Sequence, residues 1–464
     1  MDPILIGEIL SVVMFFGIIG VLMLGYPVAF SLAGTSLFFG LIAWILGVFD
    51  PSNLSSLASR YLDGAMVNDV LVAVPLFVFM GVMLERSGIA EQLLITMGRL
   101  FGELRGGLGM SVVVVGALLA ASTGIVGATV VTMGLLSLPA MLRAGYDPKL
   151  ASGVICASGT LGQIIPPSTV LIFMGDMLSG INAQVQMAKG NFAPSPVSVG
   201  DLFAGAFIPG LLLVLFYMLW VIFKAITSPQ SCPALAISAE EKKALGRDVL
   251  VALVPPLMLI IAVLGSILGG IATPTESASV GAVGAILLAI LRGRMTYPML
   301  RQVMYATAEI TSMIFVIILG ASVFSLVFRM MGGDNLVEEF LHSLPGGVMG
   351  AVIFVMLLMF VLGFILDTFE IIFIVLPITA PILLGMDVSP VWLGVMVGVN
   401  LQTSFLTPPF GFSLFYLRGV APREVSTGQI YRGVIPFVIL QLLALVALYM
   451  FPELATWLPS VIFG

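Results

Sequence analysis

Gly159-Thr160-Leu161-Gly162-Gln163-Ile164-Ile165-Pro166-Pro167-Ser168 decides the fold, and Asn400-Leu401-Gln402-Thr403-Ser404-Phe405-Leu406-Thr407-Pro408-Pro409 repeats its plan. Each stretch lies inside an apolar run long enough to cross a membrane, and each places two adjacent prolines where a helix should continue. A proline removes the hydrogen bond to the carbonyl four residues before it. In lipid, such freed carbonyls are tolerated only where they line a cavity or find another partner. Two broken helices at matching places in two halves indicate a transporter binding site.

The two stretches belong to a longer internal repeat. In both halves the first proline of the pair lies 18 residues after an earlier proline, Pro148 or Pro390. Each half also carries a Leu-Pro step further upstream, at Leu138-Pro139 and at Leu376-Pro377. Two unrelated kinked helices are the alternative explanation, but the equal spacing favours a repeat.

The composition is that of a membrane protein. Of the 464 residues, 60% are hydrophobic and only 9% are charged, whereas a soluble domain has about 25% charged residues. There is no basic run, so the net charge of −6 gives no indication of nucleic acid binding. Cys156 and Cys232 lie in an apolar run and a polar loop, which argues against a disulfide. The first residues lack the positive charge of a signal peptide and predict a retained helix.

Apolar runs of about 20 residues qualify as spanning helices. They are predicted near 4–24, 28–48, 69–88, 149–178, 200–224, 248–269, 273–291, 303–330, 390–418 and 431–452. Two further regions, 107–143 and 346–385, are interrupted midway by small or polar residues. We expect both to be re-entrant hairpins, with two ordinary short-looped spanning helices per region as the alternative.

The distribution of positive charge orients the chain. If the N-terminus is outside and both hairpins return to the side they entered, 15 of the 18 Lys and Arg residues lie inside. Only Arg60, Lys189 and Arg329 then lie outside. Single spans in place of the hairpins would degrade this bias, so the charges support hairpins of opposite orientation, as in an inverted repeat.

The predicted fold class is therefore an all-α polytopic membrane protein, an inverted repeat with two re-entrant helical hairpins and two Pro-broken helices. Its expected parts are a first scaffold with arm helices (1–105), a first transport part (106–227), a cytoplasmic linker (228–247), a second scaffold with arm helices (248–330) and a second transport part (331–464).

Four sequence elements, which occur along the chain in the family's order, resemble those of one transporter family. Residues 25–32 (GYPVAFSL) resemble its G-x-P-V-A-F-A-L element, and residues 273–278 (TPTESA) resemble T-P-T-E-A-A. Residues 159–168 resemble G-T-L-G-x-x-I-P-P-S, and residues 400–411 resemble N-L-x-x-x-x-x-T-P-P-x-G. By these motifs the chain is similar to the large membrane subunit of the TRAP (tripartite ATP-independent periplasmic) transporters, the DctM family.

The hairpin tips depart from the usual family pattern. The first reads Thr123-Gly124-Ile125-Val126 in place of S-G-S-S, and the second reads Asp367-Thr368-Phe369-Glu370. These tips resemble the subgroup for mannitol or chloroaromatic compounds, which in turn resembles carriers of 2-oxo acids.

The resemblance implies a sodium-coupled symport permease of the bacterial inner membrane that imports an organic, carboxylate-bearing anion by an elevator motion. It also implies a periplasmic solute-binding protein and a separate small, DctQ-like membrane subunit as partners. A stand-alone sodium–carboxylate carrier without a binding protein is the alternative. An enzyme is not expected, since H-E-x-x-H, G-x-S-x-G and the P-loop motif are absent from the sequence.

Sodium prefers oxygen ligands, which hydroxyls and unwound backbone supply in transporters. The expected sodium ligands are Ser122, Thr123, Ser158, Gly159, Gly162, Asp367, Thr368, Thr403 and Thr407. The expected solute-binding residues are Thr160, Gln163, Asn400 and Gln402. Packing of small residues is the alternative for the Ser and Gly positions.

Overall fold

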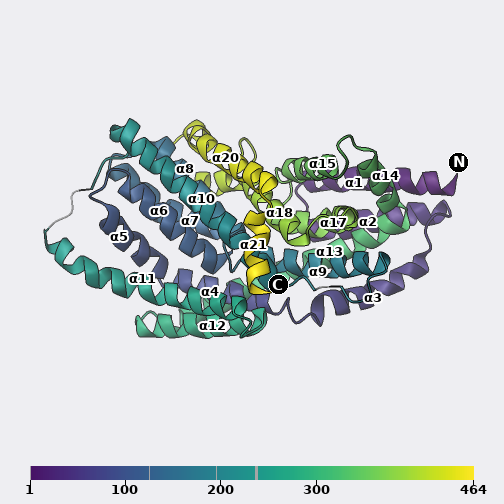
Figure 1. Ribbon diagram of the computed structural model, residues 1–464, viewed down its shortest axis with the longest axis horizontal. Helices are drawn as coiled ribbons and strands as arrows, with labels where there is room; N and C mark the ends of the chain where they lie inside the picture. The colour runs from purple at the N-terminus through teal and green to yellow at the C-terminus, as the bar shows by residue number, and fades with distance from the viewer. Residues whose placement is uncertain (1, 125, 195, 236–238) are drawn as a thin grey trace. The chain divides into compact units, whose positions relative to one another are not determined.

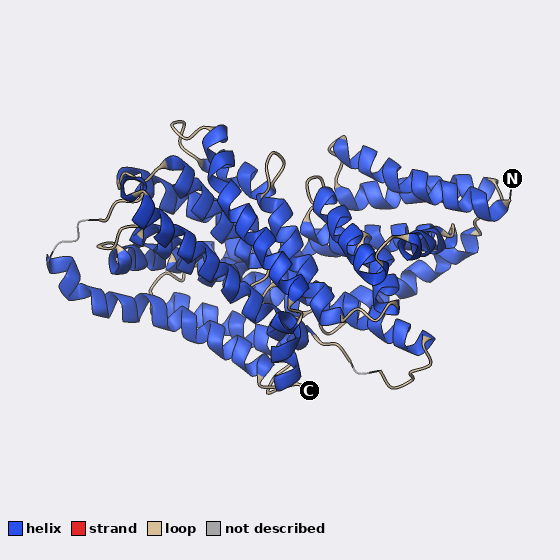
Figure 2. Cartoon of the chain, turned by 45° about the horizontal axis from the view of Figure 1, so that its top comes forward, coloured by secondary structure: helices blue, strands red, loops and turns tan. Residues whose placement is uncertain are grey.

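The computed structural model describes residues 2–124, 126–194, 196–235 and 239–464, and leaves out the side chains at positions 63, 122, 123 and 239–244. Within these ranges all regular secondary structure is helical, as Figure 2 shows. The predicted all-α class is therefore confirmed.

The first half of the chain runs from α1 to α10 (Figure 1). Its elements are α1 (Pro3–Met23), α2 (Val28–Ile45), η1 (Pro51–Ser55), α3 (Ser56–Tyr61), η2 (Leu62–Met66), α4 (Ala73–Arg86), α5 (Ile89–Phe101), α6 (Gly107–Thr123), α7 (Val126–Arg143), α8 (Pro148–Thr160), η3 (Leu161–Gln163), α9 (Thr169–Ala188) and α10 (Val199–Thr227).

The second half follows a short turn, η4 (Pro229–Ser231). Its elements are α11 (Ala239–Leu268), α12 (Pro274–Leu291), α13 (Tyr297–Met330), α14 (Gly333–Ser343), α15 (Gly347–Leu362), α16 (Thr368–Ile374), α17 (Leu376–Gly385), α18 (Pro390–Leu406), α19 (Phe412–Val420), α20 (Thr427–Met450) and α21 (Glu453–Ile462).

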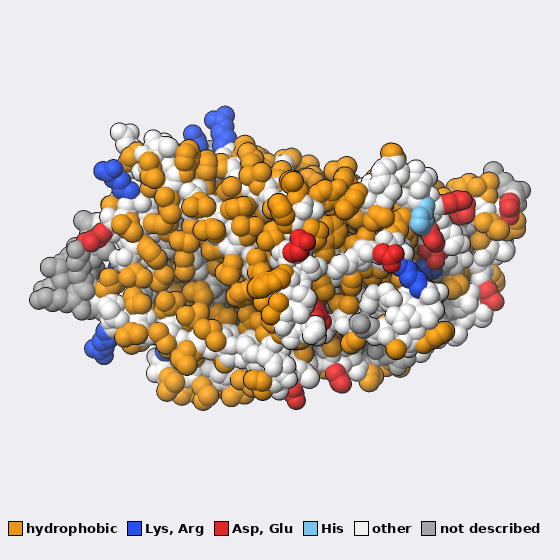
Figure 3. All heavy atoms as spheres, in the orientation of Figure 1, with side chains coloured by type: hydrophobic (Ala, Val, Ile, Leu, Met, Phe, Trp, Pro, Cys, Tyr) orange, Lys and Arg blue, Asp and Glu red, His pale blue; other side chains and the backbone are white. Residues whose placement is uncertain are grey.

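Eight helices in the described ranges are long and apolar enough to cross a membrane, and two bent helix pairs raise this to as many as ten. In the space-filling view hydrophobic side chains cover most of the visible face (Figure 3), which suits contact with lipid. The span predicted near 69–88 corresponds to α4, which has only 14 residues. It passes as a membrane segment only together with α5, from which it is bent by 59°. The polar residues over 181–199 predict a loop, but α9 continues to Ala188, so the first part of that prediction is wrong.

The repeat is visible in the backbone. Gly88 and Gly332 precede α5 and α14 with φ of 73° and 81°, and Gly106 and Gly346 precede α6 and α15 with φ of 76° and 95°. Both proline pairs contain a cis peptide bond.

The return arms of the two hairpins also match. Pro139 lies inside α7 and Pro381 lies inside α17, 242 residues later. The sequence analysis had paired Pro139 with Pro377, which lies only 238 residues later, so Pro381 is the better counterpart.

The chain divides into two compact units. Unit 1 comprises residues 1–71, 176–197 and 309–393. Unit 2 comprises residues 72–175, 198–308 and 394–464. The three cations expected outside all belong to unit 1, and the 15 expected inside all belong to unit 2. The predicted part boundaries are not tested by this division and stay predictions.

The core of unit 2 is built where glycine lets backbones touch. A Cβ atom on Gly153 of α8 would lie 2.1 Å from the carbonyl oxygen of Gly433 on α20. A Cβ atom on Gly433 would lie 2.1 Å from the carbonyl oxygen of Lys149. Small residues at such crossings allow close helix packing in membranes, and here they fix the helix that carries Thr160.

Candidate functional site

The tip of the first hairpin lies against the first broken helix, within unit 2. A Cβ atom on Gly162 would be 3.6 Å from both Ala120 and Gly124 of the tip. Beyond the prolines, the Thr169 hydroxyl donates to the Gly124 carbonyl at 3.4 Å. The hairpin tip and the broken helix carry five of the expected sodium ligands, Ser122, Thr123, Ser158, Gly159 and Gly162, and their role toward sodium stays a prediction. The side chains of Ser122 and Thr123 lie outside the described residues.

Two other members of that cluster serve helix packing. A Cβ atom on Gly159 would come within 2.3 Å of the Val130 side chain in α7, so only glycine fits there. Ser158 lies against Gly116 of α6, where an added Cβ would be 2.5 Å from that of Ser158. The packing explanation left open by the sequence is therefore realised at Gly159, while its role toward sodium stays a prediction.

Serine hydroxyls bind carbonyls that the proline pairs release. Ser168 donates to the Gln163 carbonyl at 3.1 Å, and Ser413 donates to the Phe405 carbonyl at 2.8 Å. In each half, a nearby serine thus donates a hydrogen bond to one of the carbonyls that the proline pair leaves without a partner in the helix. A carbonyl oxygen has two lone pairs, so each retains capacity for a second partner.

A buried tyrosine joins the two broken helices. Tyr217 of α10 is completely buried, and its hydroxyl accepts Nε2–H bonds from Gln441 of α20 at 2.7 Å and from Gln402 of α18 at 3.3 Å. Thr160, at the end of α8, accepts from the same Gln441 amide at 3.5 Å. Two predicted solute residues, Thr160 and Gln402, which are 242 residues apart in the repeat, are therefore joined through Gln441 and the Tyr217 hydroxyl.

Buried oxygen atoms on α8, α18 and α20 have spare hydrogen-bonding capacity. Among the described residues, Ser158 Oγ, Gln402 Oε1 and Gln441 Oε1 are buried with no hydrogen-bond partner. Buried oxygens without a donor are costly unless a ligand, ion or water serves them. Uncharged oxygen groups of this kind suit a sodium ion or the hydroxyl of a solute.

The predicted threonines of α18 keep lone pairs available. Thr403 donates to the Val399 carbonyl and Thr407 to the Thr403 carbonyl, both at 2.7 Å. Their protons are thus used along the helix, and the hydroxyl oxygens stay free to accept or to ligate. Gln163 and Asn400, the other predicted solute residues, are buried at 1% and 4% exposure.

The predicted acid of the second hairpin lies at the start of α16, in unit 1. Asp367 caps the helix, because its side chain accepts from the Thr368 N–H at 2.7 Å. The Glu370 carboxylate accepts from the Asp367 N–H at 2.9 Å. The expected shared face of the two acids is thus a reciprocal capping box. Asp367 and Thr368 belong to unit 1 and the other members of their predicted cluster to unit 2, so a common site for them stays a prediction.

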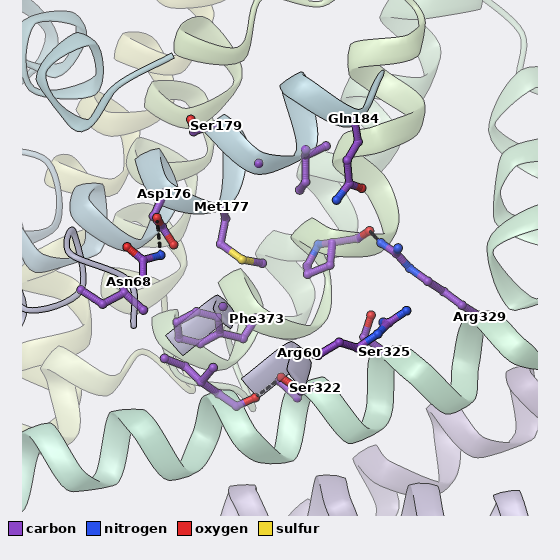
Figure 4. Close-up of a pocket in the computed structure, with 17 residues that line it drawn as sticks. Arg60, Asn68, Asp176, Met177, Ser179, Gln184, Ser322, Ser325, Arg329 and Phe373 are labelled. Atoms are coloured by element: carbon purple, nitrogen blue, oxygen red, sulfur yellow. Dashed lines mark hydrogen bonds between the residues drawn. The ribbon is translucent and has the colours of Figure 1, made fainter. Parts of the chain in front are cut away.

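Sequence reasoning did not identify Tyr217 or Gln441 as site residues. A usable signal existed, since polar residues inside spanning helices default to a functional role. It also interpreted Arg329 as an interfacial anchor. The structure places Arg329, with Arg60, in the lining of a pocket of about 540 Å³ within unit 1 (Figure 4).

Comparison with known proteins identifies the family. The sequence profile "Tripartite ATP-independent periplasmic transporter, DctM component" matches residues 15–454. The C4-dicarboxylate TRAP transporter large permease protein DctM of Vibrio cholerae is 29% identical, with 97% of this chain and 98% of that protein covered. The sialic acid TRAP transporter large permease protein SiaM of the same species is 26% identical, with 97% and 98% covered.

Among solved structures, the chain resembles the crystal structure of the Alcanivorax borkumensis YdaH transporter, described as having an unusual topology. The TM-score is 0.60 at 16% identity, covering 87% of this chain and 90% of that one, a likeness that shows the fold alone. The expected motifs, the matched broken helices and the profile agree. The chain therefore belongs to the DctM family of TRAP transporter large permeases, and is a multi-pass transporter subunit of the bacterial inner membrane and not an enzyme.

Proposed function

We propose that this chain is the sodium-coupled import subunit for an organic anion that carries a carboxylate. The observation that carries the proposal is that the buried Tyr217–Gln441 pair joins the two Pro-broken helices. Gln441 donates to Thr160 of the first, and Gln402 of the second donates to the Tyr217 hydroxyl. Broken helices at matching places in two halves are the usual site of solute and ion binding in secondary transporters. The buried oxygens of Ser158, Gln402 and Gln441 supply uncharged ligands for such a site.

The class of solute is inferred from the relatives. Their names specify C4-dicarboxylates, sialic acid and isethionate. These compounds differ in size and in acid group, since isethionate is a sulfonate, but each is an organic acid that is anionic at neutral pH. We therefore propose an organic anion as the solute, with a carboxylate as its acid group because C4-dicarboxylates and sialic acid both carry one.

Two partners follow from the proposed mode of delivery. A periplasmic binding protein captures the solute, and a small membrane subunit binds helices that are not interrupted, chiefly α1, α2, α11 and α12. Helix α11 stays continuous although it contains Pro255 and Pro256. The exposed apolar side chains of α1 and α2 support this choice, among them Phe16 at 66% and Phe30 at 70% exposure. In the proposed elevator motion, the hairpins and broken helices move against these supporting helices.

The test is uptake into proteoliposomes that contain both membrane subunits, with the binding protein and labelled solute outside. Uptake is expected to require the binding protein and to rise with an inward sodium gradient. Uptake that is equally fast without the binding protein would favour a stand-alone carrier. Uptake that does not respond to sodium would contradict the coupling.

A further inference from the structure

Unit 1 is acidic, and its few cations differ in whether they contact a carboxylate. It holds 13 Asp and Glu residues but only three Lys and Arg, a formal charge of 3 − 13 = −10. Lys189 is neutralised by Asp387, since its Nζ lies 2.6 Å from the carboxylate. Among the described side chains, no carboxylate lies within 4.0 Å of Arg60 or Arg329. These two cations line the same pocket.

The position of Arg329 is fixed by a proline. Pro381 has no N–H, so the Pro377 carbonyl loses its partner within helix α17. The Arg329 Nη2 group donates to that carbonyl at 3.1 Å. A guanidinium has five N–H donors, so this single bond orients the group and leaves most of its donors available. The half-buried Arg329 is thus a positioned cation with spare hydrogen-bonding capacity.

Arg60 of α3 reaches the same region from another element. Its positive charge acts on Arg329 as a repulsion, while Asp334 attracts Arg329 from farther along the chain. Figure 4 shows Arg60, Ser325 and Arg329 at one end of the pocket. Two like charges that share a pocket are stabilised by an anion placed between them.

The opposite end of the pocket has acceptor character. Asn68 and Asp176 lie there together (Figure 4), and the Asn68 Nδ2–H donates to Asp176 Oδ1 at 2.8 Å. Asn68 Oδ1 accepts from the Val70 N–H at 3.0 Å. The Asp176 carboxylate would repel an anionic group, so this end suits a hydroxyl or an ammonium group. The pocket, at about 540 Å³, is large enough for a small metabolite.

We propose that this pocket of unit 1 is a binding site for a small carboxylate that also carries a hydroxyl or ammonium group. The carboxylate is held by Arg60 and Arg329, and the donor group faces Asp176. The site consists entirely of unit 1 residues and shares no residue with the buried site around Tyr217. The inference rests on the proposed function only for the source of the ligand, which is then the transported solute itself.

Binding of four carboxylates to the purified protein tests the proposal, by calorimetry without sodium, binding protein or partner subunit. The probes are lactate with propionate, and malate with succinate, two pairs that differ by one hydroxyl. We expect at least one hydroxy acid to bind, and to bind more tightly than its partner. Arg60→Gln and Arg329→Gln are each expected to weaken binding by about tenfold or more. Lys189→Gln, which removes a cation of the same unit outside the pocket, serves as the matched control and keeps full affinity.

The exposed Arg60 keeps the test valid if Arg329→Gln fails to fold. A Gln402→Ala variant, altered only in the buried site, is expected to retain the arginine-dependent binding. Absence of binding for all four probes would overturn the proposal, as would equal affinities of Arg60→Gln and Lys189→Gln, or complete displacement by equimolar chloride. Because no transport is measured, a failure of sodium-coupled uptake would count against the proposed function and leave this result unaffected.

Discussion

Tyr217→Phe removes a single oxygen atom from the centre of unit 2, and its cost follows from the bonds described above. The hydroxyl accepts one N–H from Gln441 at 2.7 Å and one from Gln402 at 3.3 Å, in a fully buried position. In soluble proteins, each donor left unpaired costs about 1–3 kcal/mol. Interhelical hydrogen bonds in membrane proteins are weaker, about 0.6 kcal/mol on average and at most about 1.7. The membrane values apply here, so we expect the free energy of unfolding to fall by about 1–3 kcal/mol.

Equilibrium unfolding in mixed micelles measures this loss. Tyr431→Phe is the matched control, because it removes the same atom from a tyrosine whose hydroxyl donates to the Pro409 carbonyl at 3.0 Å in an exposed position. An exposed donor finds water, so the control is expected to lose less than about 0.6 kcal/mol. Equal losses in the two variants would refute the claim that the Tyr217 hydroxyl holds the broken helices together.

Three further outcomes are expected. Asp367→Asn is expected to keep the fold, because Asn is a good helix N-cap. Loss of a sodium contact worth about 1.5–3 kcal/mol should raise the sodium concentration for half-maximal uptake by roughly 10- to 150-fold. Thr403→Val should have a smaller effect, and an unchanged midpoint in Asp367→Asn would exclude that residue from the cation site. Ser228→Cys, in a chain without its own cysteines, is expected to react with impermeant maleimide from the cytoplasm only, and labelling from outside intact cells would reverse the orientation. Cys232 in the unaltered chain is fully buried, and burial raises the pKa of its thiol; a smaller thiolate fraction at pH 8 should make its alkylation in detergent slower than that of Ser228→Cys, and equal rates would contradict the burial.

The helix breaks could be predicted because they depend on local chemistry. Pro166 and Pro408 interrupt the backbone whatever surrounds them, and the apolar runs on each side are long enough to be recognised. Thr160 and Gln402 correspond at an offset of 242 residues, but correspondence in a repeat does not predict contact. The tyrosine that joins them lies on a different helix, and sequence spacing does not specify which helices touch.

The pocket of unit 1 that Arg60 and Arg329 line was missed for a similar reason. Arg329 ends a spanning helix, where an interfacial anchor is the ordinary expectation. Its actual partner is the Pro377 carbonyl, released by a proline in a helix 48 residues away in sequence. The available signal for this pocket was that Arg60 and Arg329 do not follow the positive-inside pattern. That signal marks the two charges as unusual but does not show which residues they contact.

Helix α5 was missed because the sequence around the bend is polar. Glu85, Arg86 and Ser87 precede Gly88, whose φ is 73°, so the residues after it look like a loop that follows a span. The segment of α14 is misleading in the same way, because its polar residues, Glu338 and His342 among them, are typical of an outer loop. It forms a helix, in which these two side chains lie 3.9 Å apart.

The turn before each broken helix shows how two copies of one motif can diverge. Gly145 has φ of 83°, and Asp387, 242 residues later, has φ of 65°, the one positive-φ residue other than glycine in the described ranges. Asp tolerates this conformation better than most residues do, although it costs more there than glycine. At the second position the side chain is a carboxylate, which binds Lys189, and that lysine also donates to the Leu384 carbonyl at the end of α17. The first turn has no side chain, whereas the second links the ends of α9 and α17, so symmetry of sequence does not make the two halves mechanically equivalent.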